Sequence, residues 1–165
     1  MKIDSLAFEA MKFARKVHID QRRKYTNNPY VDHLAEVAGI VATVNPNPIV
    51  IATAWLHDSI EDQDVSEAEL AEMFGVPVAY GVRTLSDLEE GNRATRKAAS
   101  RQRLSEAPSW VQTIKCADLI SNTSSIVMHD PDFAAIYLEE KRLLLSVLTQ
   151  ADRKLWDLAW SMANV

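Results

Sequence analysis

A chain of 165 residues is about the size of one ordinary domain and can bury one sizeable core. Its formal net charge of −5 argues against nucleic acid as the main partner, because a protein that neutralises backbone phosphates normally carries a basic excess. The single cysteine cannot form an internal disulfide. Charges interrupt the first residues every few positions, so they predict neither a signal peptide nor a membrane span, and we expect a cytoplasmic protein with no membrane partner.

The N-terminal part predicts two helices separated by a polar loop. Apolar residues recur at helical spacing over about 5–17, which predicts an amphipathic helix capped by Asp4 or Ser5. A polar stretch with a basic run follows at 20–28. A second helix is expected to begin near Tyr30, and two prolines end it because each disfavours helix in the residue before it.

The predicted helix over about 48–60 is apolar almost all round, so it belongs at the centre of a bundle. After it, Ser66 and Glu69 form the pattern of a capping box, which opens a short helix closed by Gly75. Another helix is expected over 76–85.

The C-terminal part begins with a highly charged stretch at 86–107, which we expect to be partly helical and the most mobile segment. Pro108 suits the first turn of a helix running to about 128. Two amphipathic helices follow at about 132–148 and 151–163. No segment alternates with the period of two that marks a strand, so the sequence predicts an all-α helical bundle forming a single domain over 1–165.

Ionisable residues gather at the end of the apolar central helix. His57 and Asp58 offer imidazole and carboxylate, which suit first-row divalent metals. Glu61 and Asp62 lie four residues after them, on the same faces of the helix. The spacing leaves open a simpler interpretation, in which the helix emerges into solvent and these residues form its acidic end.

Two further residues are candidates for the same site. His33 lies in the first turn of the second predicted helix, where an exposed helix-start histidine is the alternative. Asp118 interrupts the apolar string IKCADLISN, which suggests a buried position. A buried aspartate needs a partner, and a metal ion is a good one.

The order of these residues, H…HD…D, resembles the HD superfamily of metal-dependent phosphohydrolases. The strings QRRKYTNNPYVDH, AWLHDSIEDQD, FGVPVAYGVRTLSD and IKCADLISN are similar to the hydrolase domains of bifunctional alarmone enzymes and their small stand-alone relatives. That family removes pyrophosphate from the 3′ position of guanosine 3′,5′-bis(diphosphate), a nucleotide of the stringent response. The resemblance runs from about Ala7 to Leu148, and it implies an HD-domain helical bundle.

The resemblance also implies the role of each site residue. It gives four ligands to a divalent metal, usually Mn²⁺ in this family, and these are His33, His57, Asp58 and Asp118. Glu61 and Asp62 match the pair that positions and activates the attacking water.

Four residues match substrate-binding positions of the family: Arg23, Lys24, Asn122 and Tyr137. Arg23 would pack against the base and Lys24 approach a phosphate, while Asn122 would touch the sugar. Leu34 departs from the family, which usually has proline at that position.

The remaining residues of interest have simpler interpretations. His18 and His129 match no ligand position, so surface or helix-end roles are expected. The four tryptophans have helical spacing that favours packing over a stacking platform for a base. Cys116 has no histidine partner at nucleophile spacing and is interpreted as a small buried hydrophobe.

The sequence thus predicts a phosphohydrolase that binds a small-molecule nucleotide, and a homo-oligomer is left open. An HD phosphohydrolase acting on a deoxynucleoside mono- or triphosphate is the alternative enzyme. A catalytically silent helical module that binds a nucleotide or a partner protein is the alternative of another class.

Overall fold

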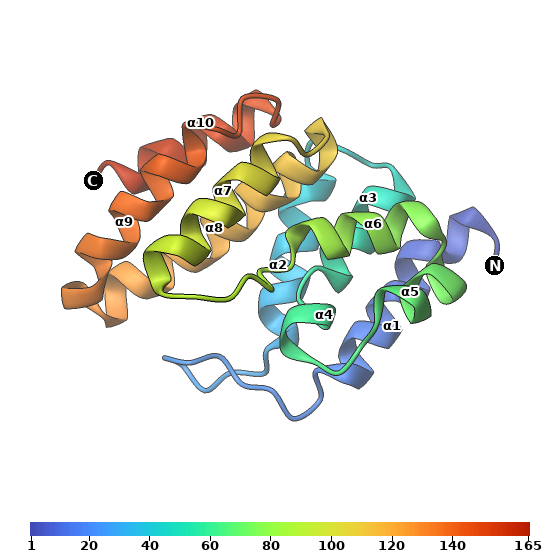
Figure 1. Cartoon of the computed structure of the whole chain (residues 1–165). Coiled ribbons are helices and arrows are strands. Elements are labelled where there is room, and N and C mark those ends of the chain that lie inside the picture. The colour runs from blue at the N-terminus through green and yellow to red at the C-terminus, as the bar shows by residue number, and fades with distance from the viewer. The chain divides into compact units, whose positions relative to one another are not determined.

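The computed structural model describes all residues from Met1 to Val165, and its regular elements are all helices. Extended segments pair only in an isolated antiparallel bridge between Arg22 and Pro29. The prediction of an all-α fold is therefore confirmed (Figure 1). None of the helices has both the length and the apolar character that a membrane crossing requires.

The chain divides into two compact units, Met1–Ser86 and Asp87–Val165, and each is described by itself. The single domain expected over 1–165 stays a prediction. The first unit contains a short 3-10 turn, η1 (Ile3–Ser5), followed by six helices. These are α1 (Leu6–Val17), α2 (Val31–Ala42), α3 (Pro48–Leu56), α4 (Ser59–Asp62), α5 (Glu67–Phe74) and α6 (Val76–Leu85).

Helix α3 forms the centre of the first unit, as its apolar sequence predicts. It packs against α1, α2 and α6, and most of its side chains are buried. A helix with no polar face is stable only when neighbours surround it, so these three helices complete the core around α3. The end of α3 is consequently held in place from several sides.

The central helix ends at Leu56, not near residue 60 as the sequence suggests. Asp58 leaves the helical path with φ −99° and ψ 0°, and the separate single turn α4 follows. Two side chains hydrogen-bond to carbonyl oxygens of the last turn. Nδ1 of His57 lies 2.7 Å from the oxygen of Ala54, and Ser59 Oγ donates to the oxygen of Leu56 at 2.7 Å. Such local bonds substitute for the next helical hydrogen bonds and end the helix.

The caps of the first unit agree only in part with the sequence. Neither Asp4 nor Ser5 caps α1 with its side chain, because Ser5 Oγ instead donates to the carbonyl oxygen of Lys2 at 2.9 Å. The N-cap of α5 does form, since Ser66 Oγ accepts from the backbone N–H of Glu69 at 3.1 Å.

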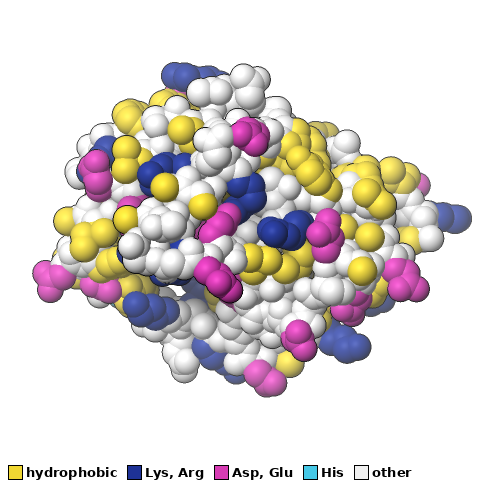
Figure 2. Space-filling model, viewed as in Figure 1, with side chains coloured by type: hydrophobic (Ala, Val, Ile, Leu, Met, Phe, Trp, Pro, Cys, Tyr) yellow, Lys and Arg dark blue, Asp and Glu magenta, His cyan; other side chains and the backbone are white.

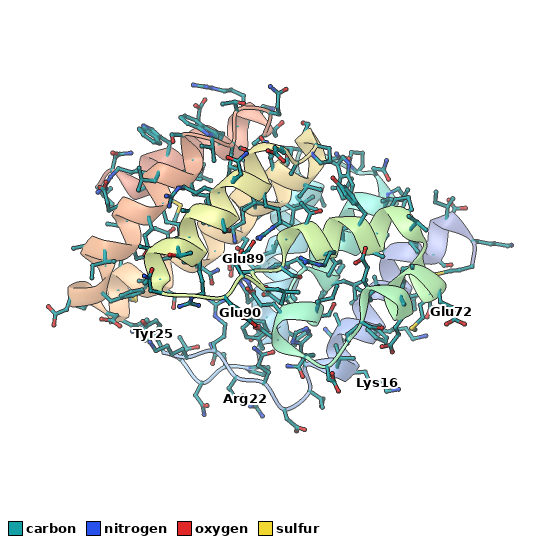
Figure 3. All side chains as sticks on the ribbon, in the orientation of Figure 1. Lys16, Arg22, Tyr25, Glu72, Glu89 and Glu90 are labelled. Atoms are coloured by element: carbon teal, nitrogen blue, oxygen red, sulfur yellow. The ribbon has the colours of Figure 1, made fainter.

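The second unit contains α7 (Arg93–Ser105), α8 (Ser109–His129), α9 (Pro131–Leu145) and α10 (Arg153–Ala163). Helix α8 is its core element and packs against the other three. The charged stretch 86–107 is partly helical, as expected, because α7 occupies residues 93–105 of it and begins after the cap Asn92. Before α7, Glu89 and Glu90 lie on the connecting segment (Figure 3), and Glu89 pairs with Arg103 of the helix.

The surface is charged in both signs. Figure 2 shows lysine and arginine side chains interspersed with aspartate and glutamate over the face that it draws, and no histidine is visible there. Three of the four histidines are in fact buried: His18, His33 and His57.

Candidate metal centre

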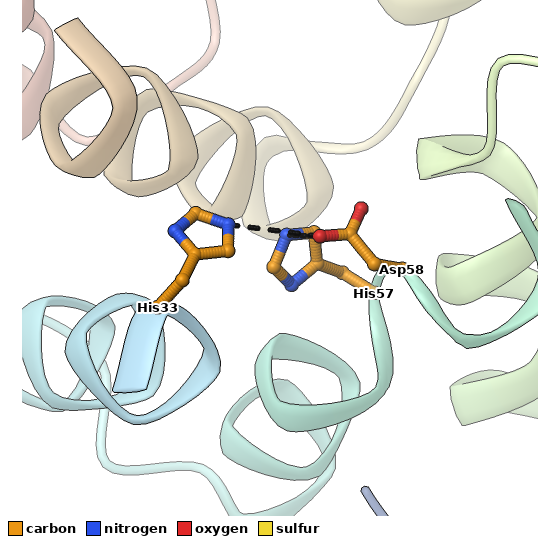
Figure 4. A group of neighbouring side chains, drawn as sticks. All are labelled: His33, His57 and Asp58. Carbon is orange, nitrogen blue, oxygen red and sulfur yellow. Dashed lines mark ion pairs between the residues drawn. The ribbon is translucent and has the colours of Figure 1, made fainter. Parts of the chain in front are cut away.

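Three of the four predicted metal ligands lie together in the first unit. His33 projects from the first turn of α2, while His57 and Asp58 occupy the break between α3 and α4 (Figure 4). One ligand atom from each residue lies within 4.8 Å of the others, and all three side chains are buried. The break in the helix has a direct role here, because it allows two consecutive side chains to face the same point.

The imidazole of His57 is fixed in one orientation by a backbone carbonyl. Its Nδ1 lies 2.7 Å from the oxygen of Ala54, which can only accept a hydrogen bond, so Nδ1 carries a proton. In the neutral ring Nε2 then presents a lone pair, and it lies 3.0 Å from Oδ2 of Asp58. Metal-binding histidines are commonly oriented by such a bond from the second ring nitrogen.

The carboxylate of Asp58 is the centre of the cluster. Its Oδ2 lies 3.0 Å from Nε2 of His57 and 3.6 Å from Nε2 of His33, and it accepts a hydrogen bond from the Tyr30 hydroxyl at 2.7 Å. Electron-rich atoms this close in a buried place need a proton or a cation among them. Two imidazole nitrogens and a carboxylate oxygen form a donor set that first-row divalent metals favour, so the cluster fits a divalent metal.

The acidic pair after the break lies on α4, one turn further along the chain. Both Glu61 and Asp62 are exposed, in contrast to the three buried residues. Asp62 Oδ2 accepts a hydrogen bond from Nε2 of Gln21 at 3.0 Å. Desolvation by surrounding protein atoms, followed by the negative charge of Asp58, raises the pKa of Asp62 above its usual range. A carboxylate with a raised pKa is a better proton acceptor.

His18 is buried at the C-terminal end of α1, with 2% of its surface exposed. The helix-end role expected for it is therefore confirmed, and the surface role is wrong. Its ring stacks on Tyr30 with 5.5 Å between centroids, and its Nδ1 lies 2.6 Å from Oε1 of Gln21. Burial lowers the pKa of His18, which favours the neutral form of the ring.

Sequence reasoning assigned no role to Gln21 or Tyr30, although both lie within the string that carries the family resemblance. The two residues flank the polar loop after α1 and are joined through the backbone, since the N–H of Tyr30 donates to the carbonyl oxygen of Gln21 at 2.9 Å. Their side chains reach Asp62 and Asp58 respectively. The sequence did give one indication of their role, because both are polar residues at the ends of the loop that precedes the predicted ligand His33.

The same loop carries the predicted substrate residues Arg23 and Lys24. Backbone hydrogen bonds close it at Arg23, whose N–H donates to Asn28 O at 2.8 Å and whose carbonyl accepts from Asn27 N at 3.0 Å. Asn27 has a φ of 58°, a left-handed conformation that asparagine tolerates better than most residues. Lys24 Nζ lies 5.0 Å from the centre of the Tyr25 ring, and Tyr25 lies at the tip of the loop (Figure 3).

The other predicted site residues belong to the second unit. Asp118 is buried on α8, where its carboxylate accepts from Lys115 Nζ and from Asn122 Nδ2, each at 2.8 Å. The predicted substrate residue Asn122 thus contacts a predicted ligand. Tyr137 is only 5% exposed, and its hydroxyl lies 3.3 Å from Thr123 Oγ1 inside this unit. The roles of Asp118, Asn122 and Tyr137 stay predictions.

A group of lysines surrounds a pocket of the second unit. Lys97, Lys115 and Lys141 line this pocket together with Asp87. Burial, followed by the repulsion of the other two lysines, lowers the pKa of Lys141 to about 7. The carboxylates of Asp87 and Glu140 line the same pocket and partly balance the lysine charges.

Comparison with known proteins places these residues in a family. The family model described as "HD domain" matches residues 10–118, more than half of the chain and the part that contains all the predicted metal ligands.

Among curated relatives, a Synechocystis protein named "Probable guanosine-3′,5′-bis(diphosphate) 3′-pyrophosphohydrolase" is 28% identical over 167 residues. The match covers 97% of this chain but only 22% of that relative, so the chain spans about a fifth of its length. A Drosophila melanogaster protein named "Guanosine-3′,5′-bis(diphosphate) 3′-pyrophosphohydrolase MESH1" is 29% identical over 127 residues, which cover 74% of this chain and 70% of the relative.

A solved structure described as "A metazoan ortholog of SpoT hydrolyzes ppGpp and plays a role in starvation responses" has the same fold. It superposes with a TM-score of 0.88 at 23% identity, and the match covers 96% of this chain and 93% of that one.

Proposed function

This chain belongs to the HD domain family, and we propose that it is a metal-dependent phosphohydrolase that removes pyrophosphate from the 3′ position of guanosine 3′,5′-bis(diphosphate). The observation that carries the proposal is the convergence of His33, His57 and Asp58 within 4.8 Å. The names of the Synechocystis and Drosophila relatives support the substrate. A cytoplasmic location and a part in the stringent response belong to the same proposal.

In this proposal His33, His57 and Asp58 hold a divalent ion, with Asp118 as the fourth ligand and Mn²⁺ as the ion. Such an ion supplies Lewis acidity and lowers the pKa of the water it binds toward neutrality. The protein contributes the orientation of the ligands, because Ala54 fixes the ring of His57 and Tyr30 fixes the carboxylate of Asp58.

Glu61 and Asp62 accept the proton of the attacking water and orient it toward the phosphorus. Their exposed position on α4 suits this work, because the water and the substrate must reach them from solvent. The raised pKa of Asp62 makes its carboxylate a stronger proton acceptor than an ordinary aspartate. Proton transfer to a carboxylate of this kind contributes about 10²–10⁴ in rate.

Arg23, Lys24, Asn122 and Tyr137 bind the nucleotide in this proposal. The guanidinium of Arg23 stacks on the base, and the ammonium of Lys24 offsets phosphate charge.

A substrate panel tests the proposal. Guanosine 3′,5′-bis(diphosphate), a deoxynucleoside monophosphate and a deoxynucleoside triphosphate are each incubated with the protein and Mn²⁺, and the products are separated. We expect guanosine 5′-diphosphate and pyrophosphate from the first substrate alone. Turnover of only the deoxynucleotides would replace the proposed substrate with the alternative one, and the metal site would be retained.

The catalytically silent module predicts a different result. It gives no product from any substrate of the panel, and the protein contains no bound metal and shows no thermal shift on addition of Mn²⁺. Metal analysis of the purified protein therefore separates this module from both enzymes.

A further inference from the structure

A chain of side-chain hydrogen bonds leads from the end of α1 to the acidic pair on α4. Nδ1 of His18 lies 2.6 Å from Oε1 of Gln21, and Nε2 of Gln21 donates to Oδ2 of Asp62 at 3.0 Å. Gln63 joins at the centre, where its Nε2 donates to the same Oε1 of Gln21 at 2.8 Å. Gln21 therefore connects two segments that are about forty residues apart in the sequence.

The direction of each bond follows from the chemistry of the groups. An ionised carboxylate only accepts, so the amide nitrogen of Gln21 must face Asp62 and its oxygen must face the other two partners. That oxygen also only accepts, so the bond from His18 requires a proton on Nδ1. Three donors, on His18, Gln63 and Gln21, thus meet two acceptor oxygens, on Gln21 and Asp62, which fixes the orientation of the Gln21 amide.

The side chain of Asp62 needs a partner from another segment to hold it in one orientation. Asp62 is the last residue of α4, a single helical turn, and its side chain is exposed. The backbone holds this turn through the N–H groups of Asp62 and Gln63, which donate to Asp58 and Ser59 at 2.9 and 3.2 Å. Those bonds fix the main chain, whereas the carboxylate is held by side chains of another segment. The amide of Gln21 donates to it at 3.0 Å, and Tyr30 also hydrogen-bonds to it.

We propose that Gln21, held in turn by His18, is a positioning residue that fixes the Asp62 carboxylate for proton acceptance in the proposed hydrolysis. The inference rests on the proposed function, because it assigns Gln21 a role in the reaction that Asp62 serves. His18 acts one step further away by supplying the hydrogen bond that orients the amide of Gln21. The side chain of Gln21 hydrogen-bonds to His18, Asp62 and Gln63, so its effect is expected in turnover and not in metal binding.

The first test is the variant Gln21→Leu, assayed with the substrate turned over by the wild type and with saturating Mn²⁺. We expect kcat to fall by about 10–100-fold, since small misplacements of a reacting group carry losses of this size. KM and the dissociation constant of Mn²⁺ are expected to change by less than about threefold, because Gln21 is not proposed to bind the substrate or the ion. A fall in Mn²⁺ affinity that accounts for the whole loss would overturn the proposal.

A buried glutamine elsewhere provides the matched control. Gln112 is fully buried in the second unit, and its amide bonds only to backbone groups, among them the oxygens of Leu104 and Ala107 at 3.0 and 3.2 Å. Gln112→Leu is expected to lower Tm while kcat of the folded protein stays at the wild-type value. If Gln112→Leu lowered kcat as much as Gln21→Leu, the effect would be one of general stability and the proposal would fail.

Two variants of His18 distinguish its hydrogen bond to Gln21 from the packing of its ring on Tyr30. Asparagine places an amide N–H near the position of Nδ1, whereas phenylalanine keeps the ring shape without any donor. We expect His18→Phe to lower kcat by about tenfold and His18→Asn to recover most of that loss, on the scale of one hydrogen bond. Equal losses in both variants would show that the ring packing on Tyr30 matters and the bond to Gln21 does not.

A double-mutant cycle tests whether Gln21 acts through Asp62. In the background of Asp62→Asn, replacing Gln21 by leucine is expected to change kcat by less than about twofold, because the group it positions is already lost. Additive losses would overturn the proposal even if both single variants are slow. A wild type without turnover on any substrate of the panel would overturn the proposed function and this inference together, whereas an active wild type with an unaffected Gln21→Leu overturns the inference alone.

Discussion

Nε2 of His57 lies 3.0 Å from Oδ2 of Asp58, although the two residues are neighbours in the sequence. Consecutive residues of a continuous helix point about 100° apart, so this approach depends on the end of α3 at Leu56. The N–H at Nδ1 of His57 donates to the carbonyl oxygen of Ala54, so Nε2 of the neutral ring and the carboxylate oxygen face each other as two electron-rich atoms. A cation between them is therefore expected to stabilise the folded protein measurably.

Metal binding is expected to raise the melting temperature. Mn²⁺ at about one hundred times its Kd stabilises the folded state by about 2.7 kcal/mol, which corresponds to a rise of roughly 5–10 °C for a chain of this size. The variant His57→Ala loses a ligand, so it is expected to show no shift and no turnover. Scanning calorimetry with and without Mn²⁺ measures this, and a full shift in His57→Ala would remove His57 from the site.

Glu61→Ala is expected to separate chemistry from metal binding. The side chain is exposed and belongs to none of the three clustered ligands, so the Kd of Mn²⁺ is expected to stay within about threefold of the wild type. Loss of acid–base assistance lowers kcat by about 10²–10⁴. Steady-state kinetics and calorimetric titration on the same preparation check both halves, and full activity would show that Glu61 has no part in the reaction.

Tyr30→Phe is expected to weaken metal binding without removing a ligand. The hydroxyl donates to Oδ2 of Asp58 at 2.7 Å, and loss of such a supporting bond typically lowers metal affinity by about 10–100-fold. Titration of the metal-free protein with Mn²⁺ gives the affinity directly. The control is Tyr80→Phe, because Tyr80 is exposed on α6; an equal loss in that variant would contradict the assignment.

Asp87 is expected to make stability depend on acid pH. Burial alone would raise its pKa, but surrounding groups outweigh burial and hold the pKa below the ordinary value of 3.8; these groups are Lys115, Ser100, Lys97 and Arg103. A carboxyl with a lowered folded-state pKa stabilises the protein above its unfolded pKa, and this contribution is lost as pH falls through the folded-state pKa. At pH 7 we expect Asp87→Asn to reduce the free energy of unfolding by about 1–3 kcal/mol.

The difference between Asp87→Asn and the wild type is then expected to shrink as pH falls from about 5 to 2.5. Urea unfolding at several pH values measures it. Asp157→Asn serves as the control, because the pair of Asp157 with Arg153 is largely exposed, at 55% and 78%, and such pairs contribute only about 0–1 kcal/mol. A difference at Asp87 that stays constant over this pH range would contradict the predicted charge effect.

The helices could be predicted largely because periodicity is a local property. The apolar run of α3 fixed its central place in the first unit, and Ser66 marked the start of α5. The break after Leu56 could not be read in the same way. It depends on side-chain bonds that His57 and Ser59 make to carbonyls of the preceding turn, and a helical pattern of apolar residues carries no information about them.

The structure brings three of the predicted metal ligands together, and the roles of the site residues stay predictions. Family resemblance identified residues by their type and order, and it named His33, His57 and Asp58 before their convergence was known. It gave His18 and Gln21 no role in the site, because the role proposed for them depends on contacts between distant segments. A histidine at the end of an amphipathic helix looks solvent-exposed until the neighbouring Tyr30 is seen to cover it.

The turn between α3 and α4 separates, along the chain, residues proposed to bind the ion from the residues proposed to accept the proton. Three of the four residues proposed to hold the ion, His33, His57 and Asp58, precede or form the turn, and the proposed proton acceptors follow it within Ser59–Asp62. Natural variation within those four positions could therefore silence turnover while the ion and the nucleotide are still held. A hydrolase built this way is only a few substitutions from a receptor for its own substrate, so loss of catalysis among its relatives need not mean loss of recognition.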